Sequence, residues 1–513
     1  MKSCLLSDRL YVPVEYVSDR ALSQFVYSLE DDEEEADLNQ FSSGVRQIRT
    51  FNKVKLGDDF YFGFARGNIA KLGRLFGDLP WQDLTATPPM TSDLRFTGGL
   101  FNWQEHGKGQ LEAASSWLKV KNGVIRASPR FGKTVTSIYI LSQLKLKTLI
   151  IAHQKDLLQQ FYNTFLSFTN IEELREQHRS PFAKKRDARG EIVGFFGDYD
   201  NPEELDVCFL CWQTFGTKAL KKSTGRTHGD ERIEKYANAW GLVICDEAHK
   251  LGGVVFSSTV NKLAAKYRLG LTGTVERVDG KEFLLRDIIG PVTAEGKSRQ
   301  VPCSVTVVHT GIKVAFGFNE PFPRLHKRLY ANKQRMKIIM EYLEKDVAAG
   351  HYICFAFHSY SVAQLQQFVE RLKAEGIRAA AFYGGLPNRE EVLEDARSGK
   401  IQVLVSNARM LTGIDVPRWN CYYSAFPTGN VIFNEQGQVS GNFYQEYSRV
   451  RTPYVNENGE PKKFGIIRDF VDETGICMGM YKKRYQAYLT EKFRIEVIKL
   501  KKDDDDKRIR WED

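Results

Sequence analysis

The chain has 513 residues, more than one hydrophobic core usually serves, so we expect two or three domains. Hydrophobic residues make up 42% and aromatic residues 12% of the sequence, as in folded globular proteins. No apolar run reaches the ~20 residues of a membrane helix, and the first residues lack the apolar stretch of a signal peptide. We therefore expect a cytoplasmic protein without a membrane partner, in the host cytoplasm if it is viral. The net charge of +9 suits a polyanionic partner but does not identify one.

The eight cysteines are sparse, and most of them lie in apolar runs. This pattern predicts buried thiols in a reducing compartment. The single CxxC, formed by Cys208 and Cys211, lies in a strand-like run with no second pair nearby. We therefore expect no zinc site.

The chain changes character twice along its length. Residues 1–95 contain short alternating runs, an acidic stretch at 31–35 and a proline-rich end, which indicate a small N-terminal accessory domain. The family resemblance described below implies DNA binding as its candidate task. Strand-like and helical runs then alternate over 96–298 and again over 299–485, as in α/β domains with parallel sheets. The last segment, 486–513, contains DDDDK and is interpreted as a native charged tail.

The strongest motif is ASPRFGKT at residues 127–134, which fits the A/G-x4-G-K-T phosphate-loop pattern between a strand-like and a helix-like run. Backbone N–H groups at a helix start can hold phosphate, and Arg130, Phe131 and Gly132 belong to this cradle. Lys133 is predicted to reach the β- and γ-phosphates of ATP, and the Thr134 hydroxyl to bind Mg²⁺.

A second motif, LVICDEAH, occupies residues 242–249. An apolar strand that ends in two carboxylates suits hydrolysis assisted by Mg²⁺: Asp246 would hold the metal, and Glu247 would polarise the attacking water. A strand that ends in a solvated acidic turn is the alternative. The phosphate loop upstream favours ATP hydrolysis.

The order of these motifs resembles that of DEAH-type superfamily 2 helicases over roughly residues 100–475. The sequence is most similar to the UvsW-like branch-migration helicases of tailed phages, with XPB-like translocases as cellular relatives. The resemblance implies two tandem RecA-like α/β domains. It also implies an ATP-dependent DNA helicase or translocase that unwinds or branch-migrates forks, junctions or R-loops in replication, recombination or repair.

The resemblance assigns further residues. Gln110 would contact adenine, with Gln104 as the competitor, and Phe101 or Trp103 would stack on the base. Gly413 and Asp415 of the motif V segment, residues 403–417, would contact the nucleotide. The residues expected to contact nucleic acid or to couple it to ATP are His153, Gln213, Thr214, Thr272, Thr274, His358, Ser359 and Thr412.

Residues 445–451, QEYSRVR, resemble motif VI, Q-x-x-G-R-x-x-R. Gln445 and Arg449 keep the family spacing, and Arg449 would be an arginine finger to the γ-phosphate, supplied by the second domain. Thr452 occupies the position of the second arginine. Either Arg451 takes over that role or the site has one finger, and we favour Arg451.

Residues 429–441 predict a β-hairpin, either a strand-separating wedge or a plain surface hairpin. Forked, branched or single-stranded DNA is the expected partner of a monomeric enzyme. Three alternatives remain open: an RNA helicase with RNA as the partner, a double-strand translocase that does not separate strands, and a non-catalytic DNA-binding scaffold.

Overall fold

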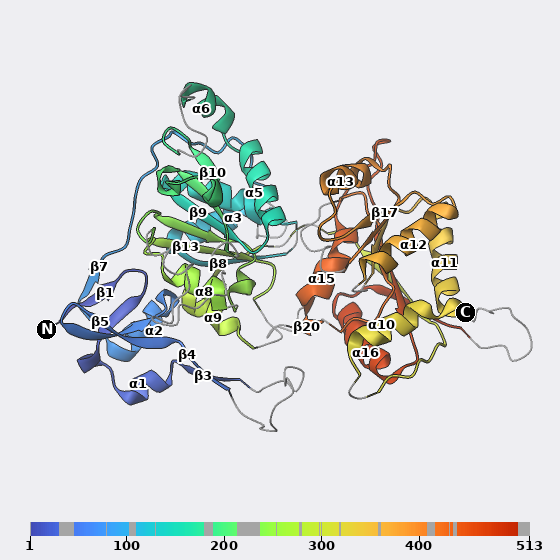
Figure 1. Cartoon of the computed structure of the whole chain (residues 1–513), viewed down its shortest axis with the longest axis horizontal. Coiled ribbons are helices and arrows are strands. Elements are labelled where there is room, and N and C mark those ends of the chain that lie inside the picture. Colours follow the sequence, from blue (N-terminus) through green and yellow to red (C-terminus); the bar gives the residue numbers. More distant parts are fainter. Residues whose placement is uncertain are drawn as a thin grey trace, which may run out of the picture. The chain divides into compact units, whose positions relative to one another are not determined.

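The structure is a computed structural model (Figure 1) that divides into two compact units, residues 1–298 and 299–513. The residues that it describes are 2–29, 46–77, 79–101, 109–128, 130–178, 188–212, 236–252, 254–275, 280–296, 298, 300–317, 320–357, 361–407, 416–429, 431–433 and 439–500.

The first unit begins with a five-stranded sheet in the order β5-β6-β2-β1-β7, in which only the β1–β7 pair is parallel. Its core contains Leu10, Val12, Phe25, Phe64 and Leu72, all fully buried. The elements of this part are β1 (Cys4–Leu6), β2 (Leu10–Pro13), α1 (Asp19–Ser23), β3 (Val26–Leu29), β4 (Arg46–Arg49), β5 (Phe51–Leu56), β6 (Asp59–Phe64), α2 (Ile69–Phe76) and β7 (Trp81–Asp83), with β3 and β4 forming a separate antiparallel pair.

Buried polar contacts join this small sheet to the rest of the first unit. Arg268 is fully buried and donates a hydrogen bond to the Asp8 carbonyl at 2.8 Å. The Tyr27 ring stacks on Phe283 with centroids 3.8 Å apart, and the Tyr27 hydroxyl donates to Asp287 at 3.1 Å. The N-terminal sheet is therefore fixed to the parallel sheet that follows it.

The rest of the first unit is a seven-stranded sheet in the order β10-β11-β9-β12-β13-β8-β14, and all of its strand pairs are parallel. Helices α3, α4 and α5 pack on one face, and α8 and α9 on the other. Its elements are α3 (Gln110–Val120), β8 (Asn122–Ala127), α4 (Lys133–Leu144), β9 (Thr148–Ala152), α5 (Lys155–Ser167), α6 (Ile171–His178), β10 (Val193–Phe195), β11 (Val207–Cys211), β12 (Leu242–Cys245), α8 (Val254–Asn261), β13 (Tyr267–Thr272), α9 (Glu282–Ile288) and β14 (Val292–Gly296).

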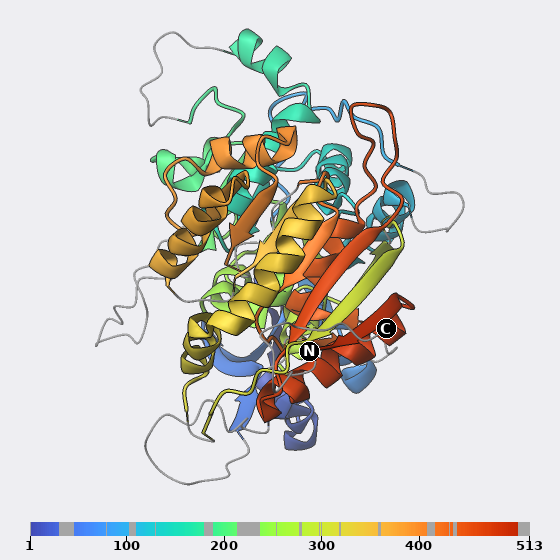
Figure 2. The ribbon, with the colours of Figure 1, turned by 90° about the vertical axis from the view of Figure 1, so that its right-hand side faces the viewer.

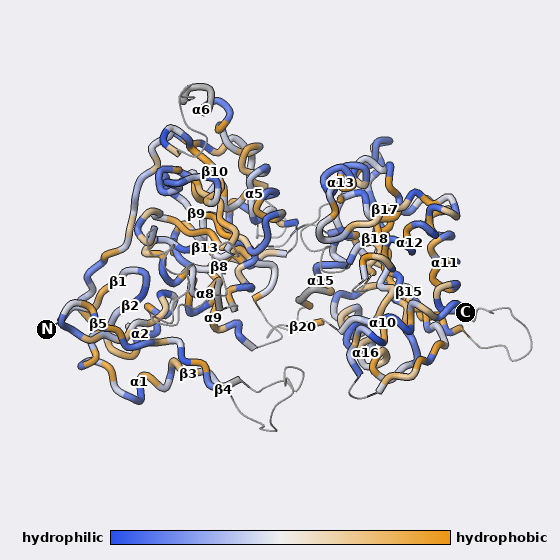
Figure 3. The backbone as a smooth tube through the Cα atoms, viewed as in Figure 1, coloured by the Kyte–Doolittle hydropathy of each residue, from blue (hydrophilic) through white to orange (hydrophobic). Residues whose placement is uncertain are grey.

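Strands covered on both faces explain the continuous apolar runs in the sequence. Every residue of β9, for example, is buried, and successive residues such as Ile150 and Ile151 enter opposite cores. Figure 3 shows the same concentration of hydrophobic residues along the central strands.

The second unit contains another parallel seven-stranded sheet, in the order β17-β18-β16-β19-β22-β15-β23. Figure 2 shows β15 and β22 side by side, with α11 lying across the sheet. The elements are β15 (Cys303–His309), α10 (Phe322–Ala331), α11 (Lys333–Ala348), β16 (Ile353–Ala356), α12 (Val362–Ala374), β17 (Ala379–Phe382), α13 (Arg389–Ser398), β18 (Val403–Ser406), β19 (Cys421–Ser424), β20 (Ile432–Phe433), β21 (Val439–Ser440), α15 (Gly441–Tyr447), β22 (Gly465–Val471), α16 (Gly475–Thr490) and β23 (Arg494–Lys499).

Charged residues inside β22 hold the helices on this sheet. Asp469 pairs with Arg484 of α16 at 2.8 Å, and both side chains are almost fully buried. Arg468, in the same strand, pairs with Asp346 of α11 at 2.7 Å. A buried charge that loses its partner costs about 3–5 kcal/mol, so these pairs fix how α11 and α16 pack.

Two α/β units with parallel sheets confirm the predicted fold class. The expected tail at 486–513 is wrong over its first part, because α16 continues to Thr490 and β23 pairs with β15 at the sheet edge. The alternating residues of β23 complete the sheet, and Phe493 and Leu500 beside it are buried. The remaining tail residues, 501–513, lie outside the described part.

The predicted hairpin is confirmed in its stem, since β20 and β21 pair antiparallel; its tip, 434–438, is not among the described residues. All eight cysteines are buried and none forms a disulfide, as expected for buried thiols. Within the described ranges, no helix is both long and apolar enough to cross a membrane.

Candidate nucleotide-binding site

The predicted ATP-binding residues of the first unit lie at one edge of its sheet. The strands β8, β13, β12 and β9 are neighbours in that order and run parallel. Their carboxyl ends therefore meet at the same edge, where α/β proteins bind ligands. The residues that follow these ends are the phosphate loop after β8, Thr272 to Thr274 at β13, Asp246 and Glu247 after β12, and His153 after β9.

The phosphate loop ends in a conformation that requires glycine. Gly132 has a φ of +84° and is the N-cap of α4, and a Cβ there would lie 2.1 Å from Nε2 of Gln110. Because glycine has no side chain to cap the helix, N–H groups of the first turn remain for an anion. Lys133 begins α4, and its Nζ donates to the Ala127 carbonyl at 3.1 Å.

Gln110 links the phosphate loop to the segment before α3. It is buried, its Nε2 donates to the Phe131 carbonyl at 2.7 Å, and its Oε1 accepts from the Phe101 N–H at 2.9 Å. The contact of Gln110 with adenine stays a prediction. Phe101 has a side chain open enough to stack on a base, at 65% exposure, whereas the competitors Trp103 and Gln104 lie outside the described residues.

Phe131 is a core residue of the loop, not a surface one. Its side chain is 2% exposed and packs against Gly296 of β14, where a Cβ would lie 2.4 Å from the ring. The bulky residue in the glycine-poor loop therefore anchors the loop to the sheet edge.

The two carboxylates follow β12 directly. The Asp246 N–H donates to the Ile151 carbonyl at 2.9 Å, which continues the pairing of β12 with β9. Glu247 has a φ of +48°, in the left-handed backbone region that residues other than glycine rarely adopt. Nδ1 of His249 lies 3.2 Å from Oε2 of Glu247 and 3.0 Å from Oγ1 of Thr272.

His249 therefore lies between the Glu247 carboxylate and the segment predicted as motif III. The sequence analysis does not include His249 among the site residues, although its position as the fourth residue of DEAH could have indicated it. The Thr272 hydroxyl also accepts from the Thr274 N–H at 3.1 Å, and both threonines are buried.

Gly273 lies beside the phosphate loop. A Cβ at this position would lie 3.6 Å from the Ala127 carbonyl oxygen and 3.9 Å from Nζ of Lys133. Both distances are ordinary van der Waals contacts, so an alanine would fit here without rearrangement.

Burial and neighbouring charges separate the acidities of these groups. Burial raises the pKa of Asp246, the Glu247 carboxylate raises it further, and the Lys133 ammonium opposes both. Burial alone would raise the pKa of Glu247, but His249, Lys133 and His153 together hold it below its usual range. Glu247 is therefore ionised at neutral pH, as a group that polarises water must be. Burial also lowers the pKa of His153 to about 4, so this histidine is neutral.

The predicted finger residues belong to the second unit. Gln445 lies in α15, Arg449 lies in the following short helix η7 (Ser448–Arg451), and both are largely buried. Arg451 is held within the same unit: its Nη1 donates to Glu491 at 2.5 Å, and its guanidinium lies 4.9 Å from the Phe493 ring centre. This pairing weighs against Arg451 as a second finger and favours the alternative with one.

Several predicted site residues fall outside the part of the chain that the structure describes. They are Gln213, Thr214, His358, Ser359, Thr412, Gly413 and Asp415.

A family model described as "Type III restriction enzyme, res subunit" matches residues 104–277. The DNA 3'-5' translocase XPB2 of Sulfurisphaera tokodaii is 23% identical, with 60% of this chain and 72% of that protein covered. The DNA 3'-5' helicase XPB of Mycobacterium tuberculosis is 31% identical, with 37% of this chain and 30% of that protein covered. The crystal structure of T4 UvsW has 14% identity and a TM-score of 0.34, with 97% of this chain and 100% of that chain covered.

The matched segment contains the phosphate loop, His153, the DEAH residues and Thr272, which lie together at one sheet edge. The order of motifs and the sequence similarity to XPB proteins make the chain similar to helicases and translocases of the XPB kind, and the two parallel sheets agree with the fold expected from this similarity.

Proposed function

We propose that the chain is an ATP-driven DNA helicase or translocase that acts on forked, branched or single-stranded DNA as a monomer. The single observation that supports this most is the assembly of Lys133, Asp246 and Glu247 at one sheet edge, with His249 joining Glu247 to Thr272. A phosphate loop alone binds nucleotides in many proteins. A hydrolytic carboxylate that lies 3.2 Å from a histidine, which in turn contacts a second motif, can transmit the state of ATP to another part of the protein.

The residues present fit a nucleotide with Mg²⁺. The start of α4 provides N–H groups and the positive end of the helix dipole, and its N-cap Gly132 makes no side-chain cap bond that would occupy them. Thr134 and Asp246 would hold Mg²⁺, which would neutralise charge on the phosphates. Among the described residues no three His, Cys, Asp or Glu side chains form a metal cage, and Mg²⁺ typically needs only one or two protein ligands beside the phosphates.

The residues of this chain then act on the bound ATP. Lys133 turns from the Ala127 carbonyl to the phosphates, Glu247 orients and polarises the attacking water, and Arg449 stabilises charge on the γ-phosphate. His249 would pass the change at Glu247 to Thr272. Gln110 fixes the loop and Phe101 would stack on the base.

DNA is proposed as the polymer because the XPB relatives are named as DNA translocases and helicases. A motor that moves along any sequence needs contacts to the backbone and not to the bases. RNA is the alternative that the experiment below distinguishes.

The test is ATP hydrolysis by the purified chain with single-stranded DNA, duplex, fork, four-way junction or RNA. We expect strong stimulation by DNA, greatest with fork or junction, and its loss in Lys133→Ala and Glu247→Gln. Lys119→Ala and Glu112→Gln, which change exposed residues of α3, are the matched controls and should hydrolyse ATP normally. Unchanged turnover in the two site variants, or stimulation by RNA alone, would contradict the proposal.

A further inference from the structure

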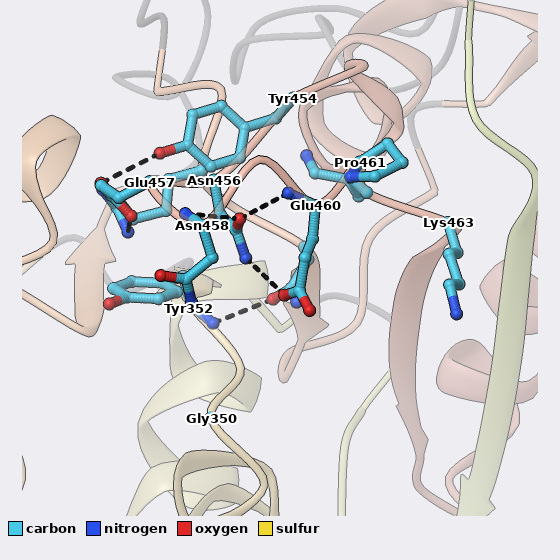
Figure 4. A pocket seen from close by; sticks show the side chains of 12 residues that line it. Gly350, Tyr352, Tyr454, Asn456, Glu457, Asn458, Glu460, Pro461 and Lys463 are labelled. Atoms are coloured by element: carbon cyan, nitrogen blue, oxygen red, sulfur yellow. Dashed lines mark hydrogen bonds and ion pairs between the residues drawn. The ribbon is translucent and has the colours of Figure 1, made fainter.

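The loop of residues 452–464 joins motif VI to β22 and folds back on itself. The Lys462 N–H donates to the Tyr454 carbonyl at 2.7 Å. The Asn456 side-chain oxygen accepts from the N–H groups of Asn458 at 3.0 Å and Glu460 at 2.8 Å. Figure 4 shows Tyr454, Asn456, Asn458 and Glu460 of this loop lining a pocket of about 610 Å³. The loop is therefore ordered by its own hydrogen bonds.

Lys462 of this loop forms hydrogen bonds with both motif V and motif VI. The Lys462 ammonium donates to the Pro417 carbonyl at 2.7 Å and the Trp419 carbonyl at 2.6 Å. It also reaches the Val450 carbonyl at 3.5 Å. Pro417 is the last residue of the motif V segment, and Val450 belongs to motif VI. A charged donor makes stronger hydrogen bonds than a neutral one, so Lys462 joins the ends of these two segments.

The side chain of Arg418, between the two bonded carbonyls, is fixed as well. Its guanidinium lies 4.9 Å from the Tyr352 ring centre and 5.4 Å from that of Tyr454. It also pairs with Glu457, and its Nε donates to the Arg397 carbonyl at 3.1 Å. Residues 417–419 are thus held through their backbone by Lys462 and through a side chain by the same loop.

We propose that Lys462 is a positioning residue that fixes motif V relative to motif VI, so that DNA binding and ATP hydrolysis change together. This inference rests on the proposed function, in which motif V contacts DNA and Arg449 of motif VI contacts ATP. The proposal gives Lys462 no direct role toward DNA or ATP. It acts through the Pro417, Trp419 and Val450 carbonyls.

The experiment compares Lys462→Met with Lys462→Arg and with Lys463→Met, whose lysine is the exposed neighbour and appears apart from the Asn456 cluster in Figure 4. Basal ATPase, DNA-stimulated ATPase, the DNA concentration for half-maximal stimulation and the melting temperature are measured for each. We expect the basal ATPase rate of Lys462→Met to stay within about twofold of the wild-type rate. The DNA concentration for half-maximal stimulation should rise about tenfold, or the stimulation itself should fall about tenfold, as for the loss of one charge-assisted hydrogen bond. Lys462→Arg should restore most of the stimulation, and Lys463→Met should match the wild type.

Equal losses of basal and stimulated activity in Lys462→Met would show a purely structural role and overturn the inference, as would unchanged DNA dependence. If Lys462→Met does not fold, Lys462→Gln, which keeps an uncharged donor, is measured in the same way and should show a smaller loss of the same kind. A wild-type enzyme that DNA does not stimulate would instead contradict the proposed function.

Discussion

Replacing Gly132 with alanine is expected to weaken ATP binding strongly. The φ of +84° at this residue costs an alanine about 1–2 kcal/mol. The new Cβ would lie 2.1 Å from Nε2 of Gln110, so the amide must leave the Phe131 carbonyl, which it now contacts at 2.7 Å. A buried polar group without its partner costs about 1–3 kcal/mol. Together the two effects destabilise the loop conformation that binds ATP by roughly 2–5 kcal/mol. This corresponds to a loss of ATP affinity of at least about 30-fold when the whole cost falls on that conformation.

Gly273→Ala is the matched control, because it is the same change at the same site. Its Cβ would meet the Ala127 carbonyl oxygen at 3.6 Å and Nζ of Lys133 at 3.9 Å, where van der Waals contact is favourable. We therefore expect ATP affinity within about twofold of the wild type, since no contact is broken.

The assay is titration of each variant with a fluorescent ATP analogue, with thermal unfolding measured in parallel. Adding Gln110→Ala removes the atom that the new Cβ would strike, so Gly132→Ala should cost less in that background; this is a double-mutant cycle. Equal affinities of Gly132→Ala and Gly273→Ala, or an equal cost of Gly132→Ala in both backgrounds, would refute the reasoning.

Three further predictions concern the second unit. Asp469→Ala leaves Arg484 buried without its partner and should lower the unfolding free energy by about 3–5 kcal/mol in chemical denaturation; a change below about 1 kcal/mol would contradict this. Burial raises the pKa of the Glu446 carboxyl to about 7, so its neutral form contributes stability that is present below pH ~4.5 and is lost as the pH rises through about 7. Over this range the unfolding free energy of the wild type should fall by about 3 kcal/mol more than that of Glu446→Gln. Parallel stability curves of the two proteins against pH would contradict this prediction. Arg449→Ala should slow ATP hydrolysis by about 10³-fold or more while ATP still binds. Arg451→Ala breaks the Glu491 pair and should mainly lower the melting temperature. The opposite pattern would make Arg451 the finger.

The sheet-edge site could be predicted from the sequence because each motif follows an apolar strand. Strands of a parallel sheet end at the same edge, so the segments containing Lys133, Glu247 and Thr272 had to approach one another once the fold class was right. The bond from His249 to Thr272 could not be predicted in the same way, because it depends on side-chain rotamers.

Other features depend on partners that are distant in the sequence. Arg451 resembled a finger because its motif is local, but its partner Glu491 is 40 residues away and lies in a segment expected to be a tail. That segment becomes a strand because β15, about 190 residues earlier, offers it a parallel edge. The short alternating run of β23 was too weak a signal beside the charged residues that follow it.

The most direct test of an ATP-driven DNA motor is displacement of a third strand from a DNA triplex, because this measures movement along duplex without requiring strand separation. Release of the labelled strand should need ATP and the wild-type chain, and should be absent for Glu247→Gln with ATP bound. Release by Glu247→Gln, or a wild-type enzyme that hydrolyses ATP on DNA yet releases no strand from the triplex or from a fork, would contradict the account.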